Sequence, residues 1–255
     1  MEDLIQMEGP ENISGVILEP VIGATVGAVV PPDGYLSLIK EICERYRILY
    51  IDDEIMTGMG RTGRWFAVDH WKVNPDILVT GKGMSGGYYP LSAVITRKEI
   101  AEQLREKGGG FIHGHTFSHH PVACAVGLAV IRYMQRNNLI ERCRQRGAYL
   151  FKKLEELKTF PFIGDVRGQG LMAGIEFVRD RKTKEPFPRS AKLTEKVSEL
   201  VFQNGLVLYP GIGFVDGVKG DMVMVGPPFI IEEKQIDELI HILKTTFSQM
   251  ENMGQ

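Results

Sequence analysis

The sequence is poor in cysteine and has no long apolar run, and both absences exclude classes of protein. Its three cysteines, Cys43, Cys124 and Cys143, are widely spaced and form no CxxC pair. Such an odd, scattered set provides no disulfide framework and favours a reducing compartment such as the cytoplasm. No stretch approaches the roughly 18 consecutive apolar residues of a membrane-spanning helix. We therefore expect a cytoplasmic protein without a membrane partner.

Charge of one sign is also missing, because the formal net charge at pH 7 is −2. A nearly neutral chain gives no reason to expect a nucleic acid or an anionic membrane as a partner. The first residues, MEDLIQMEGPENISG, contain neither the basic start nor the apolar stretch of a signal peptide. The chain is expected to be globular, and its 255 residues suffice for one large domain or two smaller ones.

The first half of the chain contains apolar runs that predict strands at 13–21, 48–55, 77–81 and 92–96. Between the first two, residues 36–46 place apolar side chains on one face of a helix. Strand, helix and strand in this order indicate crossover units and a largely parallel sheet, hence an α/β fold. Sheets of this kind bind ligands beyond the carboxyl ends of their strands.

The second half has a different pattern, with longer helices and shorter strand-like pieces. The predicted helices are 121–134, 139–157 and 232–250, the strand-like pieces are 170–178, 206–212 and 222–226, and residues 179–190 form a polar surface loop. A boundary near 135–160 would separate a larger α/β part from a smaller α+β part.

Lys82 lies in TGKGMSGG, just beyond a predicted strand and enclosed by glycines. Most lysines are solvated surface residues, and that interpretation stays open at this point. A lysine at a strand end among small residues can, however, reach a cleft and be partly desolvated. Desolvation lowers the pKa of an amine and frees it for Schiff-base chemistry.

Asp53 follows the apolar run YID, so we expect its carboxylate to be poorly hydrated. An aspartate at such a position can simply cap a helix or a turn. A buried carboxylate needs a cationic partner, because an unpaired buried charge costs several kcal/mol. A protonated pyridine nitrogen is one such partner, and an electron-sink cofactor requires it.

Two other ligand sites are conceivable from short motifs. GMGRTG at 58–63 satisfies the glycine spacing of a dinucleotide site, but it does not directly follow a strand and RWFAVDHW is a poor helix start. A glycine-rich turn is the better interpretation. Zinc could in principle be bound by histidines and carboxylates, namely His113, His115, His119, His120, Asp52, Asp53 and Glu54. Their spacing fits no named metal motif, so we expect no metal.

Taken together, the segments resemble the class III (omega-type) aminotransferases of pyridoxal-phosphate (PLP) fold type I. ILEPVIG and PPDGYL resemble the family's EP segment and the stretch that follows it, and IDDEIMTGMGRTG resembles DEV-x-TGFGRTG. NPDILVTGKGMSGGYYPLSAV resembles the segment leading to the cofactor lysine. HGHTFSHHPVACA and VRGQGLMAGIEF resemble the HG-x-TF block and the RG-x-GL signature of the small domain. The blocks occur in the family's order along nearly the whole chain.

The resemblance implies a role for each matched site residue. Asp53 would pair with the ring nitrogen of PLP, Lys82 would carry PLP as a Schiff base, and Ile55 would pack against the ring. Thr116, with the backbone near His115, would hold the phosphate of the neighbouring subunit's cofactor, which implies a homodimer with shared active sites. The implied substrate contacts are Gly114 and Arg61.

The implied reaction is transamination with ping-pong kinetics, in which an amine donor passes its amino group to a keto acid. The implied domains are a partial large cofactor-binding domain at 1–140, with a mainly parallel sheet, and a small α+β domain at 141–255. The same lysine and aspartate also serve PLP aminomutases and decarboxylases, so these activities remain alternatives. A non-catalytic fragment that binds only cofactor or a partner is a third.

The sequence departs from the family pattern in two respects. It starts just before the EP block, so we expect a partial chain that lacks the family's phosphate-cradling loop.

Several family members also carry an arginine before the PP pair, whereas this chain has none between 190 and 255. Met224 lies shortly before Pro227, and Lys219 is the nearest cation. Together with Met56 in the DEI segment, this favours an ω-amino acid or a simple amine as donor, with pyruvate as a possible acceptor.

Overall fold

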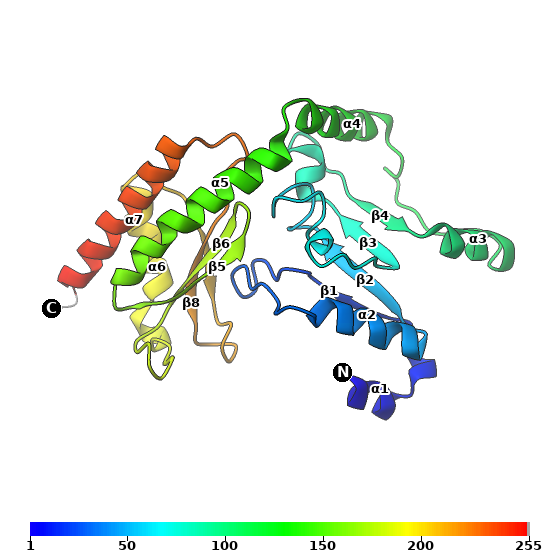
Figure 1. The fold of residues 1–255 in the computed structure, drawn as a ribbon, viewed down its shortest axis with the longest axis horizontal. Coiled ribbons are helices and arrows are strands. Elements are labelled where there is room, and N and C mark those ends of the chain that lie inside the picture. The colour runs from blue at the N-terminus through cyan, green and yellow to red at the C-terminus, as the bar shows by residue number, and fades with distance from the viewer. Residues whose placement is uncertain (254–255) are drawn as a thin grey trace. The chain divides into compact units, whose positions relative to one another are not determined.

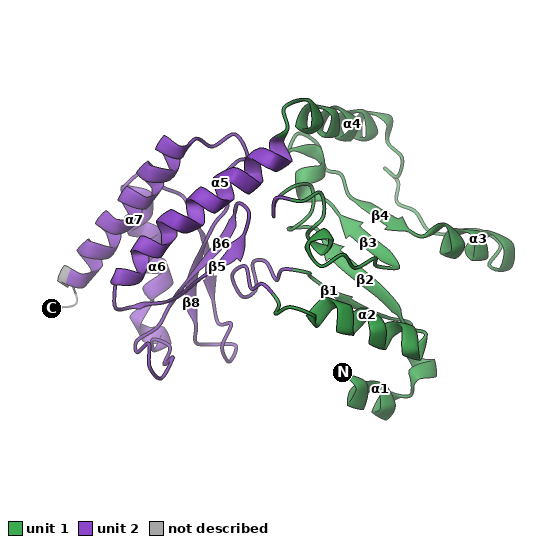
Figure 2. Cartoon of the chain, viewed as in Figure 1, with its two compact units in different colours: residues 1–20, 31–60, 64–138 green, residues 21–30, 61–63, 139–255 purple. Residues whose placement is uncertain are grey.

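The computed structural model describes residues 1–253, which form two compact units (Figures 1 and 2). Unit 1 consists of Met1–Pro20, Pro31–Gly60 and Arg64–Asn138, and unit 2 consists of Val21–Val30, Arg61–Gly63 and the chain from Leu139 onward. The last two residues of the expected domain 141–255 lie outside the described residues.

Unit 1 is built on a sheet in the order β1-β2-β3-β4, formed by Gly15–Leu18, Leu49–Glu54, Ile77–Thr80 and Ala93–Thr96. β1, β2 and β3 are parallel, and β4 is antiparallel to β3. The prediction of a largely parallel sheet is therefore confirmed, although each strand is shorter than its apolar run. Short connections explain the antiparallel edge, because β3 and β4 need no crossover helix.

Helix α2 (Tyr35–Tyr46) connects the parallel strands β1 and β2 (Figure 1). Its buried side chains Leu36, Ile39 and Cys43 share a core cluster with Tyr50 of β2. Their three-to-four spacing produces the apolar stripe that covers one face of the sheet. The predicted strand–helix–strand unit is thus confirmed.

The remaining helices of unit 1 differ in how well the sequence indicated them. α4 (Pro121–Arg136) confirms the predicted helix, but α1 (Glu2–Glu8) and α3 (Lys98–Lys107) were not predicted. α3 buries no side chain, so it has no apolar stripe to detect. Three short 3-10 helices complete the unit: η1 (Pro10–Asn12), η2 (Ala67–His70) and η3 (Lys82–Ser85).

Unit 2 is an antiparallel sheet in the order β5-β6-β8-β7, with α5, α6 and α7 contributing to one core with it. The elements in chain order are α5 (Leu139–Leu154), η4 (Glu155–Thr159), β5 (Ile163–Gln169), β6 (Met172–Phe177), η5 (Arg189–Ala191), α6 (Leu193–Gln203), β7 (Tyr209–Ile212), β8 (Asp221–Val225) and α7 (Glu233–Met253). β5 and α6 were missed by the sequence patterns. Within residues 1–253, no helix is both long and apolar enough to cross a membrane.

Aromatic rings form the centre of the unit 2 core. Phe247 of α7 is fully buried and meets Phe160 and Phe162 edge-to-face, with ring centroids 5.4 and 5.5 Å apart. Phe177 of β6 lies 5.9 Å from the same ring. These contacts join the last helix of the chain to the first two strands of the sheet, because Phe160 and Phe162 precede β5.

Truncating this ring should destabilise unit 2 strongly. We expect Phe247→Ala to lower the free energy of unfolding by about 3–5 kcal/mol, since it removes a buried ring and leaves a cavity. Phe202→Ala is the matched control, because Phe202 is 70% exposed, and it should change stability by no more than about 0.5 kcal/mol. Urea unfolding of both variants measures the difference. Equal effects would contradict the assignment of the core.

Candidate active site

The candidate site begins at the carboxyl end of β2, where side chains alternate between the two faces of the sheet. Tyr50, Asp52 and Glu54 are buried, whereas Ile51 and Asp53 on the other face are partly exposed. This alternation follows from the two-residue period of a strand. The expectation that Asp53 is poorly hydrated is met only in part, because full burial falls on its two acidic neighbours.

Asp53 and Lys82 are held together by the pairing of their strands. β2 and β3 run parallel with Asp53 opposite Val79 and Glu54 opposite Thr80. Lys82 follows Thr80 after a single glycine, so both residues lie at the same edge of the sheet. The register thus places both residues at the carboxyl ends of parallel strands, where sheets of this kind bind ligands.

Local contacts orient the residues around Asp53. The backbone N–H of Ile55 donates to Oδ1 of Asp53 over 3.0 Å, which restrains the carboxylate. The side chain of Ile55 lies close to Gly81. If Gly81 carried a Cβ atom, that atom would lie 3.1 Å from Cδ1 of Ile55. Only a residue without a side chain leaves that space open. Ile55 therefore lies against the backbone that leads directly into Lys82.

Lys82 has an unusual backbone conformation, with φ of 39° at the start of η3. A non-glycine residue in this region costs about 1–3 kcal/mol, and such residues gather at functional sites. The side chain of Lys82 is exposed. Residues 1–253 therefore do not supply the desolvation expected from the sequence.

A pair of buried carboxyl groups lies on the other face of β2. Tyr50 donates its hydroxyl to Oδ1 of Asp52 over 3.1 Å. Glu54 accepts from the hydroxyl of Thr57 and, over 2.9 Å, from the backbone N–H of Val68. Burial, and then the nearby charge of Glu54, raise the pKa of Asp52 to about 8. Burial also raises the pKa of Glu54.

The chemistry of Asp53 and Lys82 fits PLP. An exposed primary amine can condense with the cofactor's aldehyde, and a carboxylate can hold a proton on the pyridine nitrogen. Asp53 is the one carboxylate of the DDE sequence that faces away from the buried pair. The residues at this edge of the sheet therefore offer the two groups that the cofactor needs, on adjacent strands.

The segment with His115 and Thr116 lies between α3 and α4 and is exposed. It folds into a local turn, in which the backbone N–H of His115 donates to Oγ of Ser118 and the N–H of Ser118 donates to the carbonyl of His115, both over 2.9 Å. A Cβ on Gly114 would have Oγ of Ser118 as its only neighbour within 4 Å. Among the described residues, no hydrogen bond joins this turn to Asp53 or Lys82.

Arg61 belongs to unit 2, where its guanidinium is engaged by the backbone. Its Nη1 donates to the carbonyls of Leu171 and Pro227 over 3.0 and 2.7 Å. The guanidinium carbon lies 4.7 Å from the centre of the Phe229 ring. Burial lowers the pKa of Arg61. These contacts anchor the turn after β5 to the segment after β8, and the predicted substrate contact stays a prediction.

The alternative sites are not assembled by the structure. GMGRTG forms turns with Met59 and Gly60 at positive φ, and no α-helix follows it, as a dinucleotide site would require. The glycine-rich turn is thus confirmed. Across residues 1–253, no three histidine, cysteine or acidic side chains come together in a way that could hold a metal ion.

The region where some relatives carry an arginine is occupied by buried strand residues. Met224 lies in β8, whose residues are all buried, and pairs with Tyr209 and Gly174 on the neighbouring strands. The Nζ atom of Lys219 lies 3.7 Å from a carboxylate oxygen of Asp216 in an exposed loop. Lys219 is therefore engaged locally in an ion pair.

The sequence patterns did not indicate that the carboxyl groups of Asp52 and Asp76 are buried at the two ends of these strands. Asp76 precedes β3 and accepts a hydrogen bond from the backbone N–H of Tyr50 over 2.8 Å. An acidic residue within or directly before an apolar run is the signal that could have found both, because such a residue must be buried with its strand.

The raised pKa of Asp52 predicts a pH-dependent stability. In the unfolded chain the carboxyl ionises near its ordinary pKa of 3.8, whereas in the folded chain it stays protonated up to about pH 8. Stability should therefore fall as the pH rises through this window, by at most about 1.4 kcal/mol per pH unit. Asp52→Asn keeps the shape but cannot ionise, so we expect a flatter curve in urea unfolding measured from pH 4 to 8. An unchanged slope would show that Asp52 is not the responsible group.

The family model for class III aminotransferases matches residues 1–247. An uncharacterized aminotransferase of Bacillus subtilis, YodT, is 40% identical over 252 residues, which cover 98% of this chain and 57% of the relative. The putrescine–pyruvate aminotransferase of Pseudomonas aeruginosa is 39% identical over 250 residues, covering 98% of this chain and 52% of the relative. The chain thus spans about half the length of these curated relatives.

A solved structure agrees with the sequence relatives. A transaminase from the marine bacterium Virgibacillus superposes with a TM-score of 0.94 at 34% identity, covering 99% of this chain and 56% of that one. The parallel sheet with its helices, followed by the antiparallel unit, is accordingly a part of PLP fold type I. Because the family model spans nearly all of its length, the chain belongs to the class III aminotransferase family.

Proposed function

We propose that the protein carrying this chain is a PLP-dependent aminotransferase, with the chain supplying the lysine and the aspartate of the site. The observation that carries the proposal is the register of β2 and β3, which sets Asp53 and Lys82 at one edge of the sheet. Membership of the class III family supports the same reaction class. When bound, PLP would supply an aldehyde and an electron-accepting ring.

Asp53 would control the charge of the cofactor ring. Its carboxylate is held on one side by the N–H of Ile55. The other oxygen can accept a charge-assisted hydrogen bond from a protonated pyridine nitrogen, which stabilises the proton there. Ile55, lying against Gly81, offers an apolar surface to one face of the ring.

Lys82 would have two tasks in this site. Its amine would attach the cofactor covalently and, after exchange with the substrate amine, carry a proton between the substrate's Cα and the cofactor as base and acid. The exposed side chain and the short, glycine-flanked η3 leave the amine free to move between these two positions. Because Lys82 has a positive φ, its side chain leaves the backbone in a different direction from that of a residue in a regular strand.

A second subunit would complete the site through the turn at 113–118. Thr116 and His115 are exposed in unit 1, and the backbone N–H of His115 donates to Oγ of Ser118 within the turn. The exposed Thr116, with the backbone near His115, would hold the phosphate of a neighbouring copy's cofactor, as the family resemblance implies. We accordingly propose a homodimer with shared active sites, in which Gly114 and Arg61 contact the substrate.

The donor would be a simple amine or an ω-amino acid, and the acceptor a keto acid such as pyruvate. Met224 occupies a buried strand and Lys219 pairs with Asp216, so neither offers a bidentate grip on a donor carboxylate. The 39% identity to a putrescine–pyruvate aminotransferase supports a diamine or amine donor. Met56 would add to an apolar pocket.

The remaining assignments follow from the same proposal. Residues 1–140 would be part of the large cofactor-binding domain and residues 141–255 the small domain. The three scattered cysteines, none in a disulfide among the described residues, support a cytoplasmic location.

The proposal predicts a covalent linkage that depends on one lysine. Full-length protein mixed with PLP should show the absorbance band of a lysine–cofactor linkage, and Lys82→Ala should abolish it because the amine is lost. Lys98→Ala is the matched control, since Lys98 is 81% exposed on α3 and should keep the band. A Lys82→Ala variant that retains the band would show that another lysine carries the cofactor.

The products distinguish transamination from other reactions of the same cofactor. Incubation with an amine and pyruvate should produce alanine together with the oxo product of the donor. Carbon dioxide release, or an isomer of the donor without any acceptor consumed, would instead indicate a decarboxylase or an aminomutase.

A further inference from the structure

A buried carboxylate lies at the opposite end of the two strands that carry Asp53 and Lys82. Asp76 directly precedes β3 and is 4% exposed. Its Oδ2 accepts the backbone N–H of Tyr50 in β2 over 2.8 Å, and its own N–H donates to the carbonyl of Tyr50 over 2.9 Å. Both backbone groups of Tyr50 are therefore bound by one residue.

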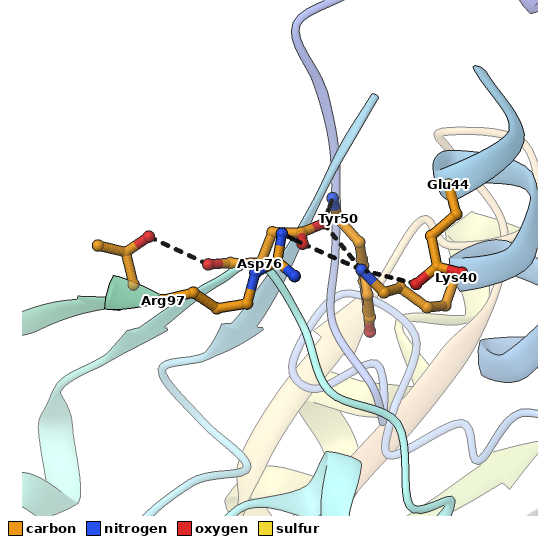
Figure 3. A network of polar contacts seen from close by, with 6 residues as sticks. Lys40, Glu44, Tyr50, Asp76 and Arg97 are labelled. Atoms are coloured by element: carbon orange, nitrogen blue, oxygen red, sulfur yellow. Dashed lines mark hydrogen bonds and ion pairs between the residues drawn. The ribbon is translucent and has the colours of Figure 1, made fainter. Parts of the chain in front are cut away.

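Two cations from different elements also reach this carboxylate, as Figure 3 shows. Nζ of Lys40, on α2, lies 3.0 and 3.1 Å from the two oxygens. Nη2 of Arg97, directly after β4, lies 2.6 Å from Oδ1. The hydroxyl of Thr96 donates to the backbone carbonyl of Asp76 over 3.1 Å. Asp76 thus joins α2 and the three strands β2, β3 and β4 at one point.

The contacts of Asp76 with Tyr50 also bear on the register of β2 against β3. The ladder contains four residue pairs, from Ile51 opposite Ile77 to Glu54 opposite Thr80. A slip of one residue would shift a strand by about 3.3 Å and turn its side chains to the other face. The carboxylate of Asp76 adds a bond that only one register can form, because it must meet the N–H of Tyr50.

The two ends of the strands are mechanically linked. Tyr50 and Asp53 belong to the same continuous strand, and Asp76 is joined to Lys82 through β3 and Gly81. Holding Tyr50 against Asp76 therefore also fixes the position of Asp53 relative to Lys82. The reason is that an extended backbone transmits a displacement along its length. A slip at Asp76 would carry Lys82 out of alignment with Asp53.

We propose that Asp76 is a positioning residue that sets the alignment of Asp53 with Lys82 by locking β2 and β3 in register. The proposal rests on the proposed function for its consequence, because alignment matters only if both residues bind one cofactor. The contacts by which Asp76 holds the two strands in register do not require the cofactor. The two parts of the proposal can therefore be tested separately.

The test compares Asp76→Asn with Asp221→Asn. Asparagine has one acceptor oxygen, so its NH2 group must face either the N–H of Tyr50 or the cations Lys40 and Arg97, and the charge that binds both cations is lost. Asp221 is the matched control, since it is 3% exposed and accepts the N–H and the hydroxyl of Thr194 over 3.0 and 2.8 Å, in unit 2. Both variants are compared in urea concentrations that give equal global stability.

The first measurement is hydrogen exchange of the chain without cofactor. Asp76→Asn should lower the protection of the β2 and β3 amides by about 10-fold or more, and Asp221→Asn should leave them unchanged at matched stability. Arg97→Gln, which removes only the partly exposed cation, should give a smaller loss at the same amides. Equal protection of the β2 and β3 amides in both aspartate variants would show that Asp76 does not hold these strands in register.

The second measurement is PLP binding by the full-length protein. At saturating PLP, Asp76→Asn should form a smaller fraction of the lysine linkage than Asp221→Asn and bind PLP about 10-fold more weakly. Normal linkage despite lost strand protection would overturn the positioning role. Absence of the linkage in the unmodified protein would instead refute the proposed function and leave the exchange result standing.

Discussion

Parallel pairing of β2 with β3 determines where the two candidate functional side chains, those of Asp53 and Lys82, lie. Asp53 takes its place from β2, of which it is a part, and Lys82 takes its place from β3, which it follows after one glycine. The sheet brings the strand ends together, and the backbone turns at Ile55 and Gly81 then orient the side chains. An arrangement of this kind is robust to changes in the loops but sensitive to the register of the sheet.

The two-residue period of β2 divides its acidic residues into two groups with different chemistry. Asp52 and Glu54 face the interior, where burial raises both pKa values. Asp53 faces the open side and keeps its carboxylate available to a cationic ring nitrogen. Asp52 and Glu54 thus belong to a buried network, whereas Asp53 is a candidate cofactor contact. The alternation of side chains along the strand places them on opposite faces of the sheet.

Much of unit 1 could be predicted from the sequence, because its parallel strands are apolar runs and α2 has a clear apolar stripe. The lysine and the aspartate were found through strand ends and family motifs together. α3 was missed because it buries nothing, and β5 because its residues IGDVRGQ do not alternate simply and it contains a bulge. The contacts of Asp76 could not be predicted, because only tertiary structure brings Lys40, Tyr50 and Arg97 together around it.

The central claim is that Lys82 carries the cofactor beside Asp53. The most direct measurement is borohydride reduction of the PLP-loaded full-length protein, followed by proteolysis and mass mapping of the phosphopyridoxyl group. The account predicts that the group is found on the peptide containing Lys82. Attachment to a different lysine, or no attachment in a protein that converts amine to oxo product, would contradict it.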